Sequence, residues 1–230
     1  MIADNLARVH ERIASACARA DRPVQSVTLL VVGKSQGAAA LRQAFAAGER
    51  RFGENYVQEA LDKIEQLADL RSEIEWQLIG PLQSNKTRAV AEQFDWVHTV
   101  DRVKIAERLS AQRPAHLPPL SVCLQVNISG EASKSGFAPE EVAAAARAVA
   151  ALPRVALRGL MALPEPVDDF EAQRRPHRAL RLLFEELCRD GFALDTLSMG
   201  MSADLEAAIV EGATLVRVGT AIFGERLPAR

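Results

Sequence analysis

The sequence predicts an α/β protein, a single TIM-type (β/α)8 barrel over residues 1–230 with an extra helix at its N-terminus. Eight apolar segments typical of buried strands recur along the chain, and segments of helical periodicity rich in Ala, Leu, Glu and Arg separate them. A length of 230 residues suits one barrel of this kind. The alternative is an open doubly wound sheet, but no GxGxxG fingerprint follows the first strand.

The elements can be placed in chain order. The first segment is expected to be a helix, because Leu6, Val9, Ile13 and Cys17 recur at helical spacing. Strands are expected at 27–34, 50–55, 75–81, 96–101, 120–128, 156–163, 196–201 and 215–220. Helices are expected between them at 37–48, 56–69, 85–93, 102–112, 139–151, 170–190 and 203–212. The Pro-rich stretch 164–166 fits a loop after the sixth strand.

The bulk properties narrow the class of protein. The chain has a net charge of −2, a pI of about 6.1 and 48% hydrophobic residues, which gives no bulk attraction to nucleic acid. No apolar run is long enough to cross a membrane. Cys17, Cys123 and Cys188 lie far apart without a CxxC or Cys/His cluster, which argues against a zinc site and for reduced thiols in the cytoplasm. Charged residues near the N-terminus, such as Asp4 and Arg8, argue against a secretory signal.

Lys34 is the first candidate site residue, because it ends the apolar segment 27–33. The site of such a barrel lies at the C-terminal ends of its strands, so Lys34 is expected at the mouth. A lysine there is costly to desolvate unless it is paired, reaches water or forms a covalent bond. Two interpretations stay open on this residue alone, a rim lysine with its ammonium in water or a lysine that forms a Schiff base.

Strand alternation predicts which neighbours point into the barrel. On the last strand Arg217 shares a face with Leu215 and Gly219, while the intervening valines suit packing under the helices, so Arg217 is expected to point inward. On the second strand Asn55 shares a face with Gly53. These registers hold for strands without bulges.

Two glycine-rich turns are candidates for a phosphate cradle. Residues 198–202 follow the seventh strand and 217–224 follow the eighth, where barrels often bind phosphate through backbone amides and helix N-termini. Gly219 and Thr220 offer backbone N–H groups with little steric cover. Ser202 is also expected to cap the next helix.

Other polar residues have simpler interpretations. Asn55 is expected to cap the following helix or to hydrogen-bond a ligand. Lys134, in the polar loop 127–136, is expected in solvent but within reach of a bound anion. His98 is expected to be a hydrogen-bonded core or rim residue, and His177 to lie at the surface. No Ser/His/Asp order or HExxH motif is present.

Seven segments together resemble the pyridoxal phosphate homeostasis protein family. They are 31–34, 51–59, 79–86, 133–136, 158–161, 198–202 and 217–224. They follow one another in order over nearly the whole chain. The resemblance implies a single barrel similar to the N-terminal domain of alanine racemase, the type III fold of enzymes that use pyridoxal 5′-phosphate (PLP).

The resemblance also implies roles for individual residues. Lys34 would carry PLP as an internal aldimine, while Ser202, Gly219 and Thr220 would hold its phosphate and Arg217 would face its pyridine nitrogen. The candidate cofactor-binding residues are Lys34, Asn55, Met199, Ser202, Arg217, Gly219 and Thr220.

Two further positions concern transfer of the cofactor. Lys134 matches a family lysine suggested as a secondary or transfer site. Gln36 stands where such sequences usually have a lysine, which puts any relay of cofactor through that position in doubt.

Two features argue against strong catalysis. Arg217 is permanently charged and only donates hydrogen bonds, so beside a pyridine nitrogen it leaves a weak electron sink. A racemase also needs an acid/base group on each face of the substrate, and the racemase family supplies a tyrosine for the second face from a further domain. The only tyrosine here is Tyr56, expected at the start of a helix. We therefore expect a PLP-binding protein that supports vitamin B6 and amino-acid homeostasis without robust catalysis.

Two alternative functions also depend on Lys34. One is a small PLP-dependent enzyme such as an amino-acid racemase, and the other is an aldolase-like barrel that forms a Schiff base with a sugar phosphate. The expected partners are PLP and, as recipients of the cofactor, PLP-dependent apo-enzymes. We expect a cytoplasmic monomer that binds neither nucleic acid nor membranes.

Overall fold

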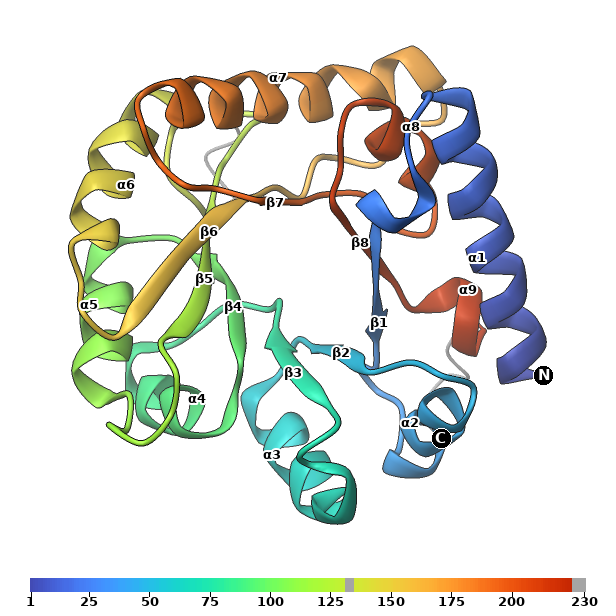
Figure 1. The fold of residues 1–230 in the computed structure, drawn as a ribbon, viewed down its shortest axis with the longest axis horizontal. Coiled ribbons are helices and arrows are strands. Elements are labelled where there is room, and N and C mark those ends of the chain that lie inside the picture. The colour runs from blue at the N-terminus through green and yellow to red at the C-terminus, as the bar shows by residue number, and fades with distance from the viewer. Residues whose placement is uncertain (131–134, 225–230) are drawn as a thin grey trace.

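Eight parallel strands pair in chain order, and the last pairs with the first to close a barrel (Figure 1). This computed structural model describes residues 1–130 and 135–224. Helices surround the ring of strands on all sides (Figure 1). The prediction of a (β/α)8 barrel with an extra N-terminal helix is confirmed.

The elements have the following bounds. The strands are β1 (Thr28–Val32), β2 (Arg51–Glu54), β3 (Glu75–Leu78), β4 (Trp96–Val100), β5 (Leu120–Gln125), β6 (Val155–Met161), β7 (Thr196–Ser198) and β8 (Leu215–Val218). The helices are α1 (Ile2–Arg19), α2 (Ala38–Ala46), α3 (Val57–Gln66), α4 (Thr87–Gln93), α5 (Val103–Gln112), α6 (Val142–Ala150), α7 (Phe170–Arg189), α8 (Leu205–Val210) and α9 (Thr220–Phe223). Short 3-10 turns are η1 (Val24–Ser26), η2 (Ala68–Leu70), η3 (Ser84–Lys86) and η4 (Pro139–Glu141).

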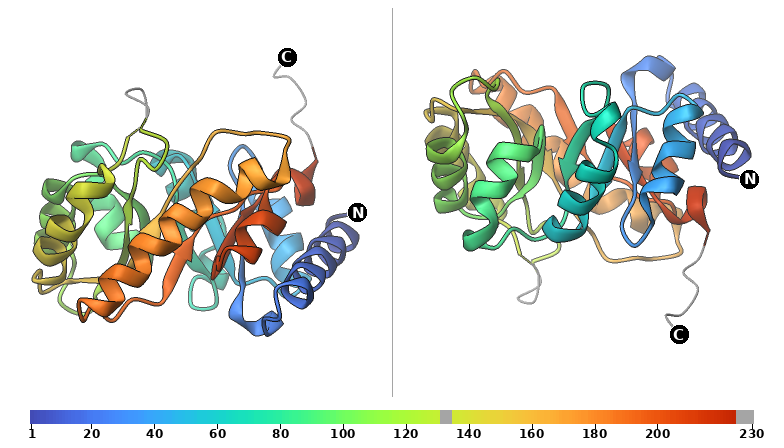
Figure 2. Two further views of the ribbon diagram at one scale, coloured as in Figure 1. Left: turned by 90° about the horizontal axis from the view of Figure 1, so that it is seen from above. Right: turned by 90° about the horizontal axis from the view of Figure 1, so that it is seen from below.

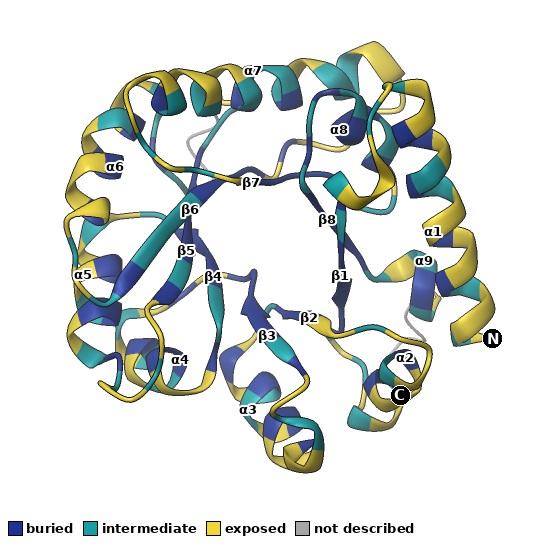
Figure 3. Cartoon of the chain, viewed as in Figure 1, coloured by how far each residue is buried: buried dark blue, intermediate teal, exposed yellow. Residues whose placement is uncertain are grey.

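The apolar side chains form two separate clusters because successive strand residues point to opposite faces. A small cluster fills the inside of the barrel and consists of Leu30, Val32, Ile79 and Leu215. A much larger cluster lies between the strands and the helices, with Phe52 and Trp76 among its largest members. Figure 3 shows the same layering: most helices are buried toward the strands and exposed outward, while α8 has no exposed residue. Buried polar residues such as His98 and Arg217 also lie inside the barrel.

Helix α1 packs against the helices that follow β7 and β8. Its buried residues are Leu6, Val9, Ile13, Ala16 and Cys17, as the helical spacing predicts. The helix lies beside α8 and α9, which are the last two helices of the chain (Figure 2). The first element therefore covers the segments that follow β7 and β8.

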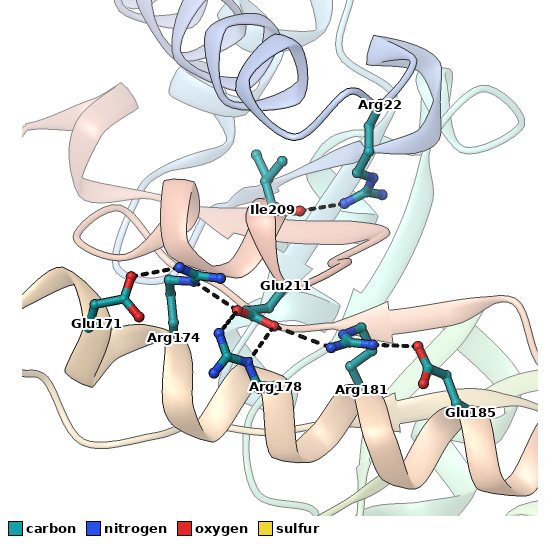
Figure 4. A network of polar contacts seen from close by, with 8 residues as sticks. All are labelled: Arg22, Glu171, Arg174, Arg178, Arg181, Glu185, Ile209 and Glu211. Carbon is teal, nitrogen blue, oxygen red and sulfur yellow. Dashed lines mark hydrogen bonds and ion pairs between the residues drawn. The ribbon is translucent and has the colours of Figure 1, made fainter.

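Helix α7 is tied to the end of α8 by one buried carboxylate (Figure 4). Glu211 is 3% exposed and accepts hydrogen bonds of 2.8 Å from Arg174 and from Arg178. Arg181 lies 3.6 Å away as a further ion-pair partner. Burial opposes ionisation, but the arginines outweigh it and lower the pKa of Glu211 below its usual value.

Some of the bulk expectations can be compared with the described residues. None of their helices is long and apolar enough to cross a membrane. Within the same ranges, no cluster of three or more His, Cys, Asp or Glu could hold a metal ion. Cys17 and Cys123 are buried and Cys188 is half-buried, and all three are free thiols.

Candidate functional site

Lys34 lies in a turn at the C-terminal end of β1, as expected. The turn is closed by a hydrogen bond of 2.9 Å from the Gln36 N–H to the Gly33 carbonyl, and Ser35 adopts a left-handed conformation with φ of 62°. The side chain of Lys34 is half-buried. Its ammonium has no hydrogen bond or ion pair with any residue between 1 and 130 or between 135 and 224. The amine is thus held at the barrel mouth without a protein partner.

A buried ion pair supports this turn from below. Lys63 of α3 donates 2.8 Å hydrogen bonds to the Gly33 carbonyl and to Glu54 Oε1 at the end of β2. Both side chains are almost fully buried, and burial raises the pKa of Glu54 to about 7 against the opposing effect of Lys63. A Cβ at position 33 would lie 2.6 Å from Glu54 Oε1, so only glycine fits there. The pair therefore fixes the backbone that presents Lys34.

Arg217 points into the barrel, which confirms the direction expected from strand alternation. It is 3% exposed and donates to the Ser198 carbonyl at 2.7 Å, to the Ser198 hydroxyl at 2.7 Å and to the Ala162 carbonyl at 2.9 Å. Burial lowers the pKa of Arg217 to about 10, so the guanidinium stays charged at neutral pH. These bonds use three of its five N–H groups, and the other two have no acceptor among the described residues.

A chain of hydrogen bonds continues from Arg217 across the barrel. Ser198 Oγ lies 2.7 Å from His98 Nδ1, and His98 Nε2 lies 2.7 Å from Gln77 Oε1. Since Gln77 Oε1 can only accept, the proton of His98 is on Nε2, and Nδ1 accepts from the Ser198 hydroxyl. Burial and the charge of Arg217 lower the pKa of His98 to about 3, so the ring is neutral.

This series of hydrogen bonds ends at the opposite mouth of the barrel. Gln77 Nε2 donates to Glu75 Oε1 at 2.5 Å, and Glu75 pairs with Arg51 at 3.4 Å. These residues line a wide hollow of about 1570 Å³ at the N-terminal ends of the strands, where Arg158 and Asp195 also pair. Because the charges named here are paired with one another, the hollow offers none of them for a ligand.

The turn after β7 is held from two sides. Asp204 accepts a 2.6 Å hydrogen bond from the Met201 N–H and lies 3.0 Å from His177 Nε2. Burial opposes ionisation of Asp204, but these hydrogen bonds lower its pKa below the usual value. Ser202 is half-buried, whereas the side chain of Met199 is fully buried in the outer core, which leaves only the Met199 backbone near the mouth.

The turn after β8 lies against the end of β1. A Cβ at Gly219 would lie 2.9 Å from the Val32 carbonyl oxygen, so a larger residue would push the two strand ends apart. Thr220 begins α9 and is exposed. Backbone N–H groups in the first turn of a helix lack intrahelical acceptors and are available to a ligand.

Asn55 follows β2 on the same mouth. Its side chain is half-buried, and its Oδ1 is buried without a hydrogen-bond partner in the described part of the chain. A buried amide oxygen without a donor costs free energy, so a donor from a ligand would be favourable there. The next residue, Tyr56, is 54% exposed.

The structure brings most of the sequence-predicted residues to one edge of the mouth. Leu30 of β1 pairs with Arg217 of β8, and Val32 of β1 pairs with Gly53 of β2, so the ends of β8, β1 and β2 are neighbours. This arrangement places Lys34 between the strands that carry Arg217 and Asn55. Lys134 lies outside the described residues.

Three expectations for single residues were wrong. Ser202 does not cap α8, because the helix begins at Leu205 and its N-cap is Asp204. Asn55 does not cap α3, whose N-cap is Tyr56. His177 is 1% exposed rather than on the surface, because Asp204 gives it a buried partner. His98 is a hydrogen-bonded core residue, as expected.

Sequence reasoning missed the supporting residues of the site. Lys63 and Glu54 were not singled out, and neither were the partners of His98 in the barrel. The strand pattern offered one usable signal, since polar residues at alternate positions of β3 must point away from the helices. Their partners, however, come from distant strands.

Residues 5–227 match the family described as the alanine racemase N-terminal domain. A "Pyridoxal phosphate homeostasis protein" of Pseudomonas aeruginosa is 60% identical over 225 residues, covering 98% of this chain and 96% of the other. The protein of the same description from Escherichia coli strain K12 is 53% identical over 226 residues, covering 98% and 97%.

Solved structures show the same similarity. PipY of Synechococcus elongatus with PLP bound superposes with a TM-score of 0.84 at 38% identity, covering 97% of this chain and 100% of PipY. Alanine racemase of Clostridium difficile superposes with a TM-score of 0.74 at 13% identity, covering 98% of this chain and 58% of that enzyme. The second similarity concerns the fold alone.

Proposed function

The chain belongs to the alanine racemase N-terminal-domain family and to its pyridoxal phosphate homeostasis proteins, and on this basis we propose that it binds PLP at the C-terminal mouth of the barrel. The observation that carries the proposal is the amine of Lys34, which lies between the strands of Arg217 and Asn55 and has no partner among the residues that the structure describes. The relative from Synechococcus elongatus, solved with PLP bound, supports it.

The residues at the mouth fit such a cofactor. Arg217 keeps two N–H groups for an acceptor, and a pyridine nitrogen is an acceptor of the right kind. The unpartnered Asn55 Oδ1 suits a hydroxyl donor. Ser202, Gly219 and Thr220 supply hydroxyl and N–H donors for a phosphate, whereas the Met199 N–H is already bonded to the Leu215 carbonyl at 3.1 Å.

Lys34 is the residue through which the cofactor would be bound covalently. PLP supplies an aldehyde, and a lysine amine that is free of ion pairs is available to react with it. The Lys63–Glu54 pair and the Gly33–Gln36 turn hold the backbone of Lys34, so its side chain always starts from the same position at the mouth. Lys134 stays the candidate for a secondary site.

We propose that binding occurs without robust catalysis. Arg217 is charged and donates to whatever it faces, so it disfavours a proton on the pyridine nitrogen. Tyr56, the only tyrosine in the sequence, is 54% exposed and is the N-cap of α3. Lack of a second acid/base group typically removes about 10²–10⁴-fold of rate. The protein then serves as a holder of PLP in vitamin B6 and amino-acid homeostasis.

The alternative function is that of an amino-acid racemase, which the match to the alanine racemase N-terminal domain supports. The expected monomer, the cytoplasmic location and the transfer of PLP to apo-enzymes stay predictions. Incubation of the loaded protein with amino acids in deuterated water separates the two functions. Exchange of the α-proton at enzymatic rates would favour the racemase.

Covalent labelling tests the assignment of Lys34. The purified chain is mixed with PLP, the absorption spectrum is recorded, and borohydride followed by peptide mapping locates the modified lysine. We expect a yellow protein with the label on Lys34, and loss of that label in Lys34→Ala. The matched control is Lys86→Ala, a half-buried lysine of η3, which should keep the label.

The other outcomes are equally informative. Labelling of Lys34→Ala at the wild-type level would reject Lys34 as the attachment residue. Residual labelling confined to Lys134 would identify the secondary site, and its loss in the double variant would verify this. A colourless chain that is trapped by borohydride with a sugar phosphate would favour the aldolase-like alternative.

A further inference from the structure

Two polar residues of α1 lie two helical turns apart at the edge of its buried face. Asn5 and Arg12 are spaced with Val9 so that all three lie along one side of the helix. Both polar side chains are part-buried, and both bond to segments that lie 190 or more residues later in the sequence. These segments are the turns that follow β7 and β8.

Arg12 holds the turn after β7. Its Nη2 donates to the Ser202 carbonyl at 2.9 Å. Its Nε and Nη2 also donate to the two carboxylate oxygens of Glu206, at 2.8 Å and 2.9 Å, in the first turn of α8. A planar guanidinium bound to a carboxylate at two points has one orientation, so the carbonyl it also binds is fixed in space.

The bond to Ser202 has a consequence for the backbone. In a trans peptide the N–H of the next residue points opposite to the carbonyl. Because Arg12 draws the Ser202 carbonyl toward α1, the N–H of Ala203 points away from α1. The orientation of this peptide group is therefore set by a side chain from the other end of the chain.

Asn5 holds the segment after β8. Its Nδ2 donates to the Ile222 carbonyl of α9 at 2.7 Å. Arg8 donates to Asn5 Oδ1, which directs the amide N–H₂ group toward Ile222. The helix α9 starts at Thr220 directly after Gly219, so a bond to its carbonyl also restrains those two residues.

We infer that α1 positions the phosphate-binding turns, with Arg12 and Asn5 as positioning residues for the phosphate group of the cofactor. The inference rests on the proposed function, because it assigns Ser202, Gly219 and Thr220 to the phosphate. Backbone donors that are already oriented bind an anion without an ordering cost, whereas loose turns lose affinity to that ordering. The extra helix thus acts on affinity although it touches no ligand.

The test compares PLP with pyridoxal, which has the same ring and aldehyde but no phosphate. Dissociation constants for both are measured by spectral titration of the full chain and of the variants Arg12→Gln and Asn5→Ala. We expect Arg12→Gln to weaken PLP binding by about tenfold, which corresponds to one charge-assisted hydrogen bond, and Asn5→Ala to weaken it by about fivefold, because its bond is neutral. Neither variant should change the binding of pyridoxal. Arg12→Lys keeps a donor for the Ser202 carbonyl and should recover part of the PLP affinity.

Arg22 provides the matched control. It also anchors α8 from the N-terminal part of the chain, through 2.7 Å and 2.8 Å bonds to the Ile209 and Ala213 carbonyls. These carbonyls lie at the far end of α8, away from Ser202 (Figure 4 shows the bond to Ile209). Arg22→Gln should therefore change stability to urea as Arg12→Gln does, while both dissociation constants stay at the wild-type value.

The outcomes separate the inference from the proposed function. If Arg12→Gln weakens the binding of PLP and of pyridoxal equally, the inference is overturned. An unchanged affinity for PLP would overturn it as well. Asn5→Ala acts on the other turn and gives the same comparison should Arg12→Gln fail to fold. A wild-type chain that binds neither compound refutes the proposed function itself.

Discussion

His98 Nδ1 lies 2.7 Å from the hydroxyl of Ser198, a bond that crosses the inside of the barrel from β4 to β7. The two strands are not neighbours in the ring, so this contact is not part of the sheet. Through Ser198 it reaches Arg217, and through Gln77 it reaches the opposite mouth. One neutral histidine therefore connects both ends of the barrel interior.

We expect His98 and Ser198 to be energetically coupled. His98→Leu removes the acceptor of the Ser198 O–H and the donor to the buried Gln77 oxygen, and should lower the free energy of unfolding by about 2–4 kcal/mol. Combined with Ser198→Ala, it should show a coupling energy of about 0.5–3 kcal/mol in urea unfolding. Thr99→Val on the same strand, whose hydroxyl bonds the Gly80 carbonyl instead, is the control and should add to Ser198→Ala without coupling. Additive behaviour of the His98 pair would contradict the connection.

We expect Lys63→Met to be strongly destabilising. The change leaves Glu54 buried without its partner, and removal of one member of a buried pair costs about 3–5 kcal/mol. The control is Arg42→Met, which breaks the exposed pair with Asp69 and should change the free energy of unfolding far less, because solvent screens exposed pairs. The double variant with Glu54→Met should be more stable than Lys63→Met alone. Equal effects of the two single variants in urea unfolding would show that the buried pair has no special role.

Glu54 should give the wild-type protein a pH dependence that Glu54→Gln lacks. Its pKa in the folded state is about 7, above its ordinary value of 4.5, so the folded state binds more protons than the unfolded state between these values. Its contribution to stability is fully present below pH 4.5 and is lost as the pH rises through about 7. The free energy of unfolding, measured in urea at pH 5 and pH 8, should fall more in the wild type, by at most about 3 kcal/mol. Parallel curves for the two proteins would refute the assignment.

Glu211→Gln should loosen the attachment of α7 to α8. The variant keeps the shape of the side chain but removes the charge that three arginines share (Figure 4). We expect a loss of about 2–4 kcal/mol in the free energy of unfolding and faster hydrogen exchange in α7. Glu185→Gln, at a half-exposed partner of Arg181, is the control and should change little. Because the pKa of Glu211 is lowered, the difference should disappear as the pH falls through the acid range.

The fold could be predicted from the sequence because its signals are local. Strands buried on both faces read as short apolar runs, and the helices between them read as amphipathic segments. The inward direction of Arg217 followed from Val216 and Val218 on either side of it. Lys34 could be placed at the mouth because a barrel aligns the C-terminal ends of its strands.

The supporting contacts could not be predicted because their partners are far apart in the sequence. His98 and Ser198 are 100 residues apart, and Arg12 and Ser202 are 190 apart. Nothing in the local pattern of either member indicates the other. The same limit explains the wrong expectation for His177, since its partner Asp204 lies 27 residues away. The expectation for Ser202 failed for a local reason: α8 begins at Leu205 rather than at residue 203, so Asp204 is its N-cap.

The attachment of α1 to the turns after β7 and β8 has a consequence for the timing of synthesis. The residues to which Asn5 and Arg12 bond are made 190 or more residues after them, and β1 gains its pairing with β8 only at that stage. A nascent chain that stops before Thr220 lacks the final turn and the contact that orients it. Helix α1 and strand β1 therefore stay without these contacts until the segments after β7 and β8 have been made.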